Sequence, residues 1–437
     1  MLKSLKIVNV TKQFKTVLKR IIRHNSVAST TLQNDFSNSQ WKDKSNLYKQ
    51  LYSKILTCGP ISIADYMKEV LTNPIDGYYM KKDVFGHKGD FVTSPEISQL
   101  FGEMIAVWIL HEWKKISNKN FQLVELGPGR GTLSNDILRV FKQLQCADKV
   151  SLHLVEISPT LSEIQAKNLC ASYEDIKPVV NSNVKNAIGP YRQGITKDGI
   201  KIFWYYSVND VPQNFSVIIA HEFFDALPIH KFQKSNKGWH EVLIDIDKNS
   251  SSQEKFRYVQ TKGPTLASKL YLEKSETRLH VEISPQTMVL VDTLANFLTQ
   301  NGGFGLIIDY GHDGEKTDTF RSFREHKQHD PLLNPGTADL TADVDFSLIR
   351  KIATKNNRLV TFGPINQEDF LKQLGIEVRL QSLLKNATDK EKKFIIDGYR
   401  QITDANQMGS VFKVFSVFPA VLKQHLEKWP VSGFMIS

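Results

Sequence analysis

The chain has 437 residues, of which 41% are hydrophobic, and carries 56 Lys and Arg against 46 Asp and Glu. This length and composition allow one large α/β domain or two smaller ones and exclude a largely disordered chain. No apolar run approaches the roughly 18 residues of a membrane span, which excludes an integral membrane protein. The few cysteines form no CxxC pair, so we expect a reducing compartment, no disulfide scaffold and no metal site: Cys58, Cys146 and Cys170.

The formal charge of +10 is concentrated at the N-terminus. Residues 1–34 hold no acid and seven basic residues, and subtracting those seven leaves +3 on the other 403 residues: Lys3, Lys6, Lys12, Lys15, Lys19, Arg20 and Arg23. Because the charges of the other 403 residues nearly balance, a nucleic-acid partner is disfavoured.

The basic segment also has the spacing of an amphipathic helix. Its apolar residues recur at i, i+3, i+4, i+7 and i+8, and a hydroxyl-rich stretch follows at 26–31: Phe14, Val17, Leu18, Ile21 and Ile22. This pattern favours a mitochondrial presequence over 1–34, cut somewhere in 23–40. A frayed basic tail or a membrane-surface helix is the alternative.

The next part of the chain predicts helices. Apolar spacing indicates one over 41–57, one over 62–71 with Ser62 as N-cap, and a buried one over 96–115. Between the last two lies a glycine-punctuated loop over 85–95. We therefore expect residues 41–115 to form a helical extension with a loop that covers a pocket.

From residue 116 onward, short Val- and Ile-rich strands alternate with helices, which predicts a mostly parallel sheet covered on both faces. The expected strands are 121–125, 151–156, 201–206, 216–220, 305–309, 358–362 and 411–417, and the expected helices 133–144, one from Ser158-Pro159, 343–356 and 367–374. Antiparallel strands at 229–233, 239–246 and 256–259 interrupt this series. They predict a β-rich insertion at about 229–300 in a domain spanning 116–437.

A glycine loop follows the first of these strands. Gly127, Gly129 and Gly131 have the spacing GxGxG, and Thr132 stands where a dinucleotide-binding GxGxxG loop has its last glycine. Such glycines let the backbone turn tightly and approach a ligand at a helix N-terminus. The loop, with its preceding acidic strand end, resembles motif I of the class I S-adenosylmethionine (SAM) methyltransferases.

Two acids flank this loop. Glu156, at the end of the second strand, can accept protons from both ribose hydroxyls of a nucleoside, or it is an ordinary solvated strand-end glutamate. Glu125 can bind the methionine ammonium through water, orient the loop or cap a helix. Around the third strand, Trp204 and Asp210 stand where a class I enzyme clamps adenine, although Trp204 also suits a core position.

The exit of the fourth strand carries His221, Glu222 and Asp225. Ligands of open α/β sheets bind outside the carboxyl ends of the strands. Carboxylates there can pair with a guanidinium, orient it and accept its charge, so we expect Glu222 and Asp225 to contact a cationic substrate. Helix capping is the alternative for both acids. His221 can take up a proton or be a structural histidine.

With these pieces in place, the chain resembles the MidA-type mitochondrial arginine methyltransferases that assist assembly of respiratory complex I. The similarity covers roughly 58–420 and is carried by stretches 89–103, 124–133, 154–159, 221–228, 308–312, 335–346 and 363–367. It implies a class I SAM-dependent fold with SAM as cofactor and a mitochondrial matrix location. It also implies symmetric dimethylation of an arginine in the 49-kDa subunit of complex I.

The resemblance draws attention to two further groups of residues. It implies that the loop residues cover the SAM pocket, although they also suit a capping box: Asp90, Thr93, Ser94 and Glu96. Asp309, Tyr310 and His312, at the fifth strand's exit, can contact the arginine or close the pocket. The usual arginine methyltransferases carry two glutamates on a longer loop, whereas here a Glu and an Asp stand three apart.

Three other functions remain as alternatives. A non-catalytic assembly chaperone of complex I that retains a SAM pocket would share the motifs. A nucleotide-dependent oxidoreductase is disfavoured by Thr132, and a methyltransferase for RNA or a small molecule is disfavoured, though not excluded, by the low charge of the remainder.

Overall fold

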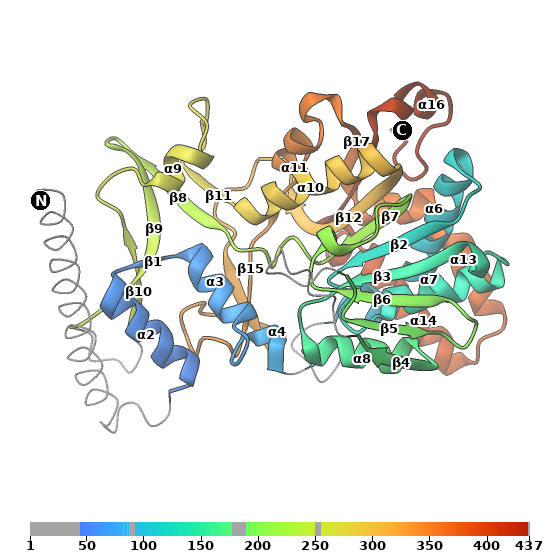
Figure 1. The fold of residues 1–437 in the computed structure, drawn as a ribbon, viewed down its shortest axis with the longest axis horizontal. Coiled ribbons are helices and arrows are strands. Elements are labelled where there is room, and N and C mark those ends of the chain that lie inside the picture. The colour runs from blue at the N-terminus through green and yellow to red at the C-terminus, as the bar shows by residue number, and fades with distance from the viewer. Residues whose placement is uncertain are drawn as a thin grey trace, which may run out of the picture.

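The structure is a computed structural model that describes residues 44–81, 83–84, 86, 92–176, 189–249 and 255–435. The expected presequence and Asp90 lie outside these residues. Over the described ranges, no helix is both long and apolar enough to cross a membrane. The chain forms a large central sheet flanked by helices and, beside it, a smaller β-rich region with the N-terminal helices (Figure 1).

The central sheet has the strand order β17-β18-β12-β7-β2-β3-β6-β5-β4, and β16 pairs with β12. The five inner strands from β12 to β6 are parallel, whereas β18, β17, β5 and β4 each join by antiparallel pairing. The strands are β2 (Phe121–Leu126), β3 (Val150–Val155), β4 (Ser172–Asp175), β5 (Arg192–Ile195), β6 (Lys201–Tyr205), β7 (Ser216–His221), β12 (Gly303–His312), β16 (Val344–Asp345), β17 (Leu359–Asn366) and β18 (Phe412–Pro419). The mostly parallel sheet expected from the sequence is confirmed.

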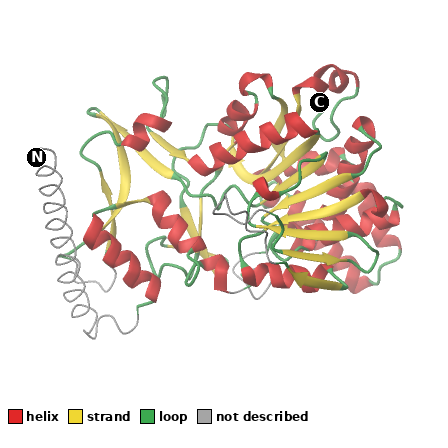
Figure 2. Ribbon diagram, in the orientation of Figure 1, coloured by secondary structure: helices red, strands yellow, loops and turns green. Residues whose placement is uncertain are grey.

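Helices cover both faces of this sheet, as Figure 2 shows. Alternate strand residues belong to two cores: Leu123 packs with α6, α7 and α12, whereas Val124 packs in the core that contains α10 and α11. The helices are α6 (Gln99–Ile116), α7 (Thr132–Gln143), α8 (Pro159–Leu169), α10 (Pro285–Asn301), α11 (Phe346–Ala353), α12 (Gln367–Gln373), α13 (Ile376–Lys385), α14 (Asp389–Thr403), α15 (Met408–Val411) and α16 (Lys423–Lys428).

The β-rich region is a second sheet with the order β1-β9-β8-β11, in which β10 also pairs with β9. A third, small sheet has the order β14-β13-β15. The strands are β1 (Ile61–Ser62), β8 (His230–Ser235), β9 (Gly238–Ile246), β10 (Phe256–Gln260), β11 (His280–Ile283), β13 (Arg321–Arg324), β14 (Lys327–His329) and β15 (Asp339–Thr341). Three helices of the extension lie in this region with α9 (Leu266–Tyr271): α2 (Asn46–Cys58), α3 (Ile63–Thr72) and α4 (Tyr78–Lys81).

The extension and the insertion form one structural unit. Ile61 of the extension pairs with Ile244 of the insertion in an antiparallel ladder, and residues from both regions share one core. Helix α10 instead packs in a core of the central sheet. We therefore propose to end the insertion at Ile283 rather than at about residue 300.

Helix starts follow local capping chemistry. Ser62 caps α3, accepting a hydrogen bond from the backbone nitrogen of Asp65 at 3.0 Å, and Ser158 caps α8 ahead of Pro159. The helix expected over 96–115 is broken at Ser98, which is extended and caps α6. The preceding turn is a separate short helix, α5 (Ser94–Ile97).

Candidate functional site

The glycine loop connects β2 to α7 and has a backbone that side chains disfavour. Gly127, Gly129 and Gly131 have φ values of 62°, 55° and 80°, in the left-handed region. A Cβ on Gly127 would lie 2.7 Å from Cδ2 of Phe223, a contact that no real Cβ tolerates. The loop therefore needs glycine both for its turn and for its close packing against the exit of β7.

A pocket opens at this loop. Its lining brings together the three regions that the sequence singled out: the covering segment, the glycine loop and the exit of β7. Among the lining residues are Thr93, Glu96, Glu125, Thr132, His221 and Glu222. We call this cavity the loop pocket.

Glu96 ties the covering segment to the glycine loop. Its carboxylate accepts a hydrogen bond from the Thr132 hydroxyl, and Arg130 Nη1 lies 3.5 Å away. Arg130 also forms an ion pair with Asp83 at 2.6 Å. The capping-box alternative is wrong, because the Thr93 side chain makes no capping hydrogen bond. Thr93 lines the loop pocket, as the sequence suggested.

Glu125 lines the loop pocket from the end of β2. Its side chain is buried and accepts a hydrogen bond from the Ser134 hydroxyl in the first turn of α7. Burial raises the pKa of Glu125 to about 7, although the Ser134 hydrogen bond opposes the shift. A polar ligand group that donates to Glu125 would favour its charged form.

Glu156 follows β3 directly and is not a solvated strand-end residue, since only 6% of it is exposed. Its carboxylate accepts hydrogen bonds from the Ser158 backbone nitrogen at 2.7 Å and from Gln165 Nε2 at 3.0 Å. Burial raises the pKa of Glu156 to about 7 against these two hydrogen bonds. The carboxylate is thus held rigidly where a hydroxyl-bearing ligand can reach it.

A second pocket also has Gly127 in its lining. We call it the groove; it is lined by Glu156, Ile157, Tyr206, Asn209, Phe223 and residues of α3 and α10. Trp204 is in the core, the position that the sequence favoured over an adenine contact, and its indole donates to Gln165 Oε1 at 2.9 Å. Asp210 is not among the lining residues, but its neighbour Asn209 is.

The exit of β7 is a turn rather than a helix. No helix follows Asp225 directly, so the helix-capping alternative for Glu222 and Asp225 is wrong. Glu222 has a φ of 49°, a strained value for a glutamate. Asp309 of β12 holds the turn, because its Oδ2 accepts the backbone N–H groups of Phe223 at 3.1 Å and Phe224 at 3.0 Å.

Asp225 is buried in this turn, with 6% of the residue exposed. Its Oδ2 accepts hydrogen bonds from the hydroxyls of Tyr310 and of Thr341, the latter at 2.8 Å. Its Oδ1 has no hydrogen-bond partner among the described residues, and neither has Glu222 Oε1. Burial raises the pKa of Asp225. The turn thus presents two buried acceptor atoms that nothing in the described chain satisfies.

His221 adjoins these acids without bonding to them. Its Nε2 lies 3.4 Å from Glu222 Oε1, but the arrangement is not a hydrogen bond. Burial lowers the pKa of His221 to about 3, so the imidazole is neutral near pH 7. Burial, with Asp225 nearby, raises the pKa of Glu222 to about 8, while the backbone of Ser94 opposes this by hydrogen bonding.

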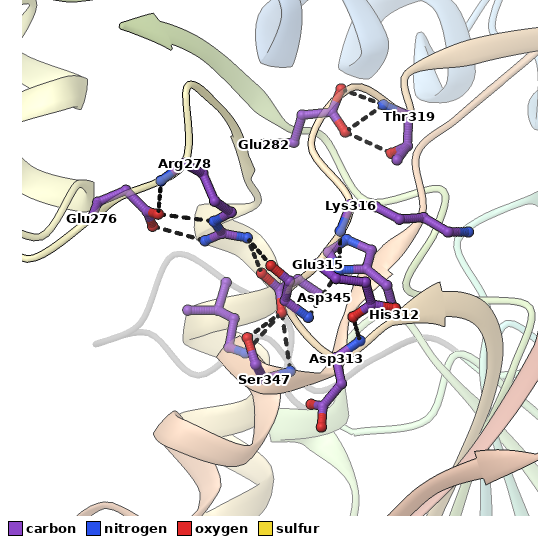
Figure 3. Close-up of polar contacts among 12 residues, drawn as sticks. Glu276, Arg278, Glu282, His312, Asp313, Glu315, Lys316, Thr319, Asp345 and Ser347 are labelled. Atoms are coloured by element: carbon purple, nitrogen blue, oxygen red, sulfur yellow. Dashed lines mark hydrogen bonds and ion pairs between the residues drawn. The ribbon is translucent and has the colours of Figure 1, made fainter.

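His312 does not join the site. His312 is the last residue of β12, and its Nδ1 accepts a hydrogen bond at 3.0 Å from the Gly314 nitrogen in the loop that follows (Figure 3). Arg278 braces the same loop through Asp345 at 3.1 Å and the Gly314 carbonyl at 3.2 Å. This histidine therefore fixes a loop and has no contact with the two pockets.

Several residues of the site carried no signal in the sequence. Gln165 lies within α8, and its amide joins Glu156 to the carbonyl oxygen of Gly129 at 2.7 Å. Thr341 comes from the stretch 335–346, which is part of the family resemblance but for which the sequence indicated no role. Such residues act through contacts between distant segments, which periodicity does not reveal.

Comparison with known proteins agrees with this geometry. The model of a family of S-adenosyl-L-methionine-dependent methyltransferases matches residues 104–365. The chain is 49% identical over 392 residues to the Drosophila melanogaster protein arginine methyltransferase NDUFAF7 homolog, mitochondrial, covering 89% of this chain and 88% of that protein. It is 48% identical over 379 residues to the Homo sapiens protein arginine methyltransferase NDUFAF7, mitochondrial, covering 85% and 83%.

Among solved structures, a Burkholderia thailandensis protein bound to S-adenosyl-homocysteine shares the fold. The TM-score is 0.67 at 22% identity, over 86% of this chain and 92% of that one. The fold and the similarity over most of the chain lead to one conclusion. The chain belongs to the NDUFAF7 family of SAM-dependent methyltransferases.

Proposed function

We propose that the chain is a protein-arginine N-methyltransferase of the mitochondrial matrix that symmetrically dimethylates an arginine in the 49-kDa subunit of complex I and so assists complex I assembly. The observation that carries the arginine specificity is the pair of unsatisfied carboxylate oxygens, Glu222 Oε1 and Asp225 Oδ1, beside the loop pocket. The names of the NDUFAF7 relatives, which include "mitochondrial", support the activity and the compartment.

The residues of the two pockets fit SAM. Glu156 would accept hydrogen bonds from the ribose hydroxyls, the groove beside Ile157 and Tyr206 would hold adenine, and the glycine loop would contact the methionine part. Glu125 receives the methionine ammonium directly or through water. Thr93 and Glu96 of the covering segment would close the loop pocket next to the glycine loop. When bound, SAM supplies an electrophilic methyl group on a sulfonium.

The substrate side is the turn after β7. Glu222 and Asp225 hold the guanidinium through charge-assisted hydrogen bonds, which orient one nitrogen for in-line attack. As that nitrogen gains a methyl group, the guanidinium must lose a proton, and the carboxylate of Glu222 accepts it. His221 Nε2 lies 3.4 Å from Glu222 Oε1, but burial lowers the pKa of His221 to about 3, so this imidazole stays neutral and the proton remains on Glu222 until it passes to solvent.

The spacing of these acids differs from a double-glutamate loop. Glu222 and Asp225 come from one tight turn, and Asp225 is fixed by Tyr310 and Thr341. We infer that the two carboxylates have unequal roles. Asp225, which these two hydroxyls fix, positions the guanidinium, and Glu222 accepts the proton.

Mass spectrometry of the 49-kDa subunit tests the proposal. Subunit from mitochondria that contain this protein is expected to carry a symmetrically dimethylated arginine, and subunit from mitochondria that lack it is expected to be unmodified. An identical pattern at every arginine would defeat the enzymatic proposal. Loss of assembled complex I without the protein tests the assembly role on its own.

A non-catalytic assembly chaperone that retains a SAM pocket is the second candidate, because it would have the same loop pocket and groove. The enzyme and the chaperone proposals predict different results for variants that fold but cannot transfer a methyl group. Glu222→Gln, which binds SAM but cannot take up the proton, would assemble complex I normally if the protein were only a chaperone. Gly129→Val, which blocks the cofactor's approach, is the matching variant without SAM binding. Under our proposal neither variant restores methylation or the assembly of complex I.

A further inference from the structure

A third carboxylate lies beside the Glu222–Asp225 pair. Asp339 is in β15, is 3% exposed, and stands two residues before Thr341. Side chains two apart on a strand share a face, and Thr341 on that face donates to Asp225 at 2.8 Å. Asp339 therefore faces the turn after β7.

The extension fixes this third carboxylate. Tyr79 of α4 donates its hydroxyl hydrogen to Asp339 Oδ1 at 2.8 Å. The charge of Asp339 contributes to the raised pKa values of Glu222, Tyr79 and Tyr310, so these groups share one poorly screened region. Figure 1 places β15 beside α3 and α4, whereas the other two acids lie in the turn after β7.

Two oxygen atoms of the Glu222–Asp225 pair have no donor among the described residues. Asp225 is more than nine-tenths buried, and its Oδ1 is without a hydrogen-bond partner among the described residues, as is Glu222 Oε1. Buried acceptors are normally satisfied, because leaving one unpaired costs stability. A guanidinium offers five N–H donors in a planar fork, whereas an ammonium offers three donors from a single point.

We propose that Asp339, positioned by Tyr79, is the third carboxylate of the substrate pocket and makes the pocket selective for a guanidinium over an ammonium group. This inference rests on the proposed function. Three acids from two separate segments, the turn after β7 and β15, can surround a planar fork from more than one side, which a point charge cannot use equally well. Tyr79 is a positioning residue, through which the N-terminal extension acts on substrate selection.

The test compares Asp339→Asn and Tyr79→Phe with the unchanged protein. Methyl transfer from labelled SAM to purified 49-kDa subunit gives KM and kcat between pH 6 and 9, and calorimetry gives the Kd of S-adenosylhomocysteine. We expect KM to rise about tenfold or more in both variants, with the Kd changed less than about twofold. In Asp339→Asn the acid limb of the rate profile is expected to move to lower pH, because Glu222 loses a negative neighbour.

The preference of the pocket for a guanidinium over an ammonium group is measured in a separate experiment. Inhibition constants of N-acetylarginine amide and N-acetyllysine amide are compared, and the preference for the arginine compound is expected to shrink about tenfold in Asp339→Asn. Tyr66→Phe is the matched control, because it also removes a tyrosine hydroxyl hydrogen bond in the extension, to the Pro331 carbonyl oxygen at 2.8 Å. It is expected to leave KM and selectivity unchanged.

The outcomes separate the two proposals. Unchanged KM, pH profile and selectivity in both variants would overturn the role of Asp339 while leaving arginine methylation intact. Absence of transfer by the unchanged protein would defeat the proposed function, and binding of the two amides would then still decide whether the pocket prefers guanidinium. If Asp339→Asn does not fold, Tyr79→Phe decides, since it retains the ring and every charge.

Discussion

The amide nitrogen of Gln165 donates a hydrogen bond to Glu156 Oε2 at 3.0 Å and so fixes the Glu156 carboxylate. The same amide nitrogen lies 2.7 Å from the Gly129 carbonyl oxygen, and the amide oxygen accepts the Trp204 indole hydrogen at 2.9 Å. One buried side chain thus links the core, the glycine loop and the acid expected to bind ribose. Its orientation is fixed, because each end of the amide has a defined partner.

Gln165→Leu should therefore weaken cofactor binding. The substitution keeps the volume but leaves the Trp204 indole and the Gly129 carbonyl without their partner, so Glu156 loses its fixed orientation. We expect the Kd of S-adenosylhomocysteine, measured by calorimetry, to rise about tenfold. Gln367→Leu is the control, because Gln367 is equally buried and bonds to the Ile402 carbonyl at 2.9 Å in a part of the chain that lines neither pocket. An equal loss of affinity in both variants would contradict a specific role for Gln165.

Gly127→Ala should lose cofactor binding through Phe223. The new Cβ would lie 2.7 Å from Phe223 Cδ2, so the ring or the loop must move. Gly199→Ala imposes a similar backbone penalty of about 1 kcal/mol without a clash, since Gly199 has a φ of 82° and nothing within 4 Å of the added atom. We expect S-adenosylhomocysteine binding to be lost only at position 127. Phe223→Leu in the Gly127→Ala background should restore part of it, and no restoration would locate the defect elsewhere.

The sequence predicted what depends on local chemistry. The strand–loop–helix around Gly127 and the cap at Ser62 follow from glycine conformation and helix-end hydrogen bonding, and both are present. It did not predict that Ser98 would split the helix expected at 96–115, because one serine in an apolar run is compatible with a continuous helix. Helices α13 and α14 were also not predicted.

What the sequence could not predict are partners far apart in the chain. Glu96 meets Thr132, and Tyr79 meets Asp339, across 36 and 260 positions. Such pairs form only because the extension folds against the insertion and the sheet. His312 shows the converse, since its place at a strand exit suggested a role in the site but its side chain fixes a loop.

The affinity for S-adenosylhomocysteine should depend on pH through Glu156. Burial raises its pKa to about 7, whereas acceptance of two ribose hydroxyl hydrogens requires the ionised form. Below pH 7 the free protein holds a proton that the ligand must displace, so affinity should fall about tenfold between pH 8 and pH 6 and level off above pH 8. Calorimetry of the unchanged protein and of Glu156→Gln checks this. A variant that binds measurably and keeps the full pH dependence would exclude Glu156 as its source.

Glu282 should matter for stability and not for cofactor binding. Its carboxylate accepts hydrogen bonds from the backbone nitrogens of Thr319 and Phe320, each at 3.0 Å, and from the Thr319 hydroxyl at 2.6 Å, which fixes the loop seen in Figure 3. Glu282→Ala leaves these donors unpaired, and we expect a loss of about 2–4 kcal/mol in the free energy of unfolding. Chemical denaturation measures this loss. A changed Kd for S-adenosylhomocysteine would contradict a purely structural role.

Glu222 should lower the stability of the folded protein while its carboxyl group supports activity. Its φ of 49° costs about 1 kcal/mol for a glutamate, and its buried carboxyl adjoins Asp225. Asparagine tolerates this backbone and carries no charge, so Glu222→Asn should raise the unfolding free energy by about 1 kcal/mol and lower kcat about a hundredfold. Glu325→Asn is the control: Glu325 has a φ of 50° but a side chain 79% exposed, so stability should rise similarly with kcat unchanged. If Glu222→Asn is less stable than the unchanged protein, the carboxyl stabilises the turn and the strain argument fails.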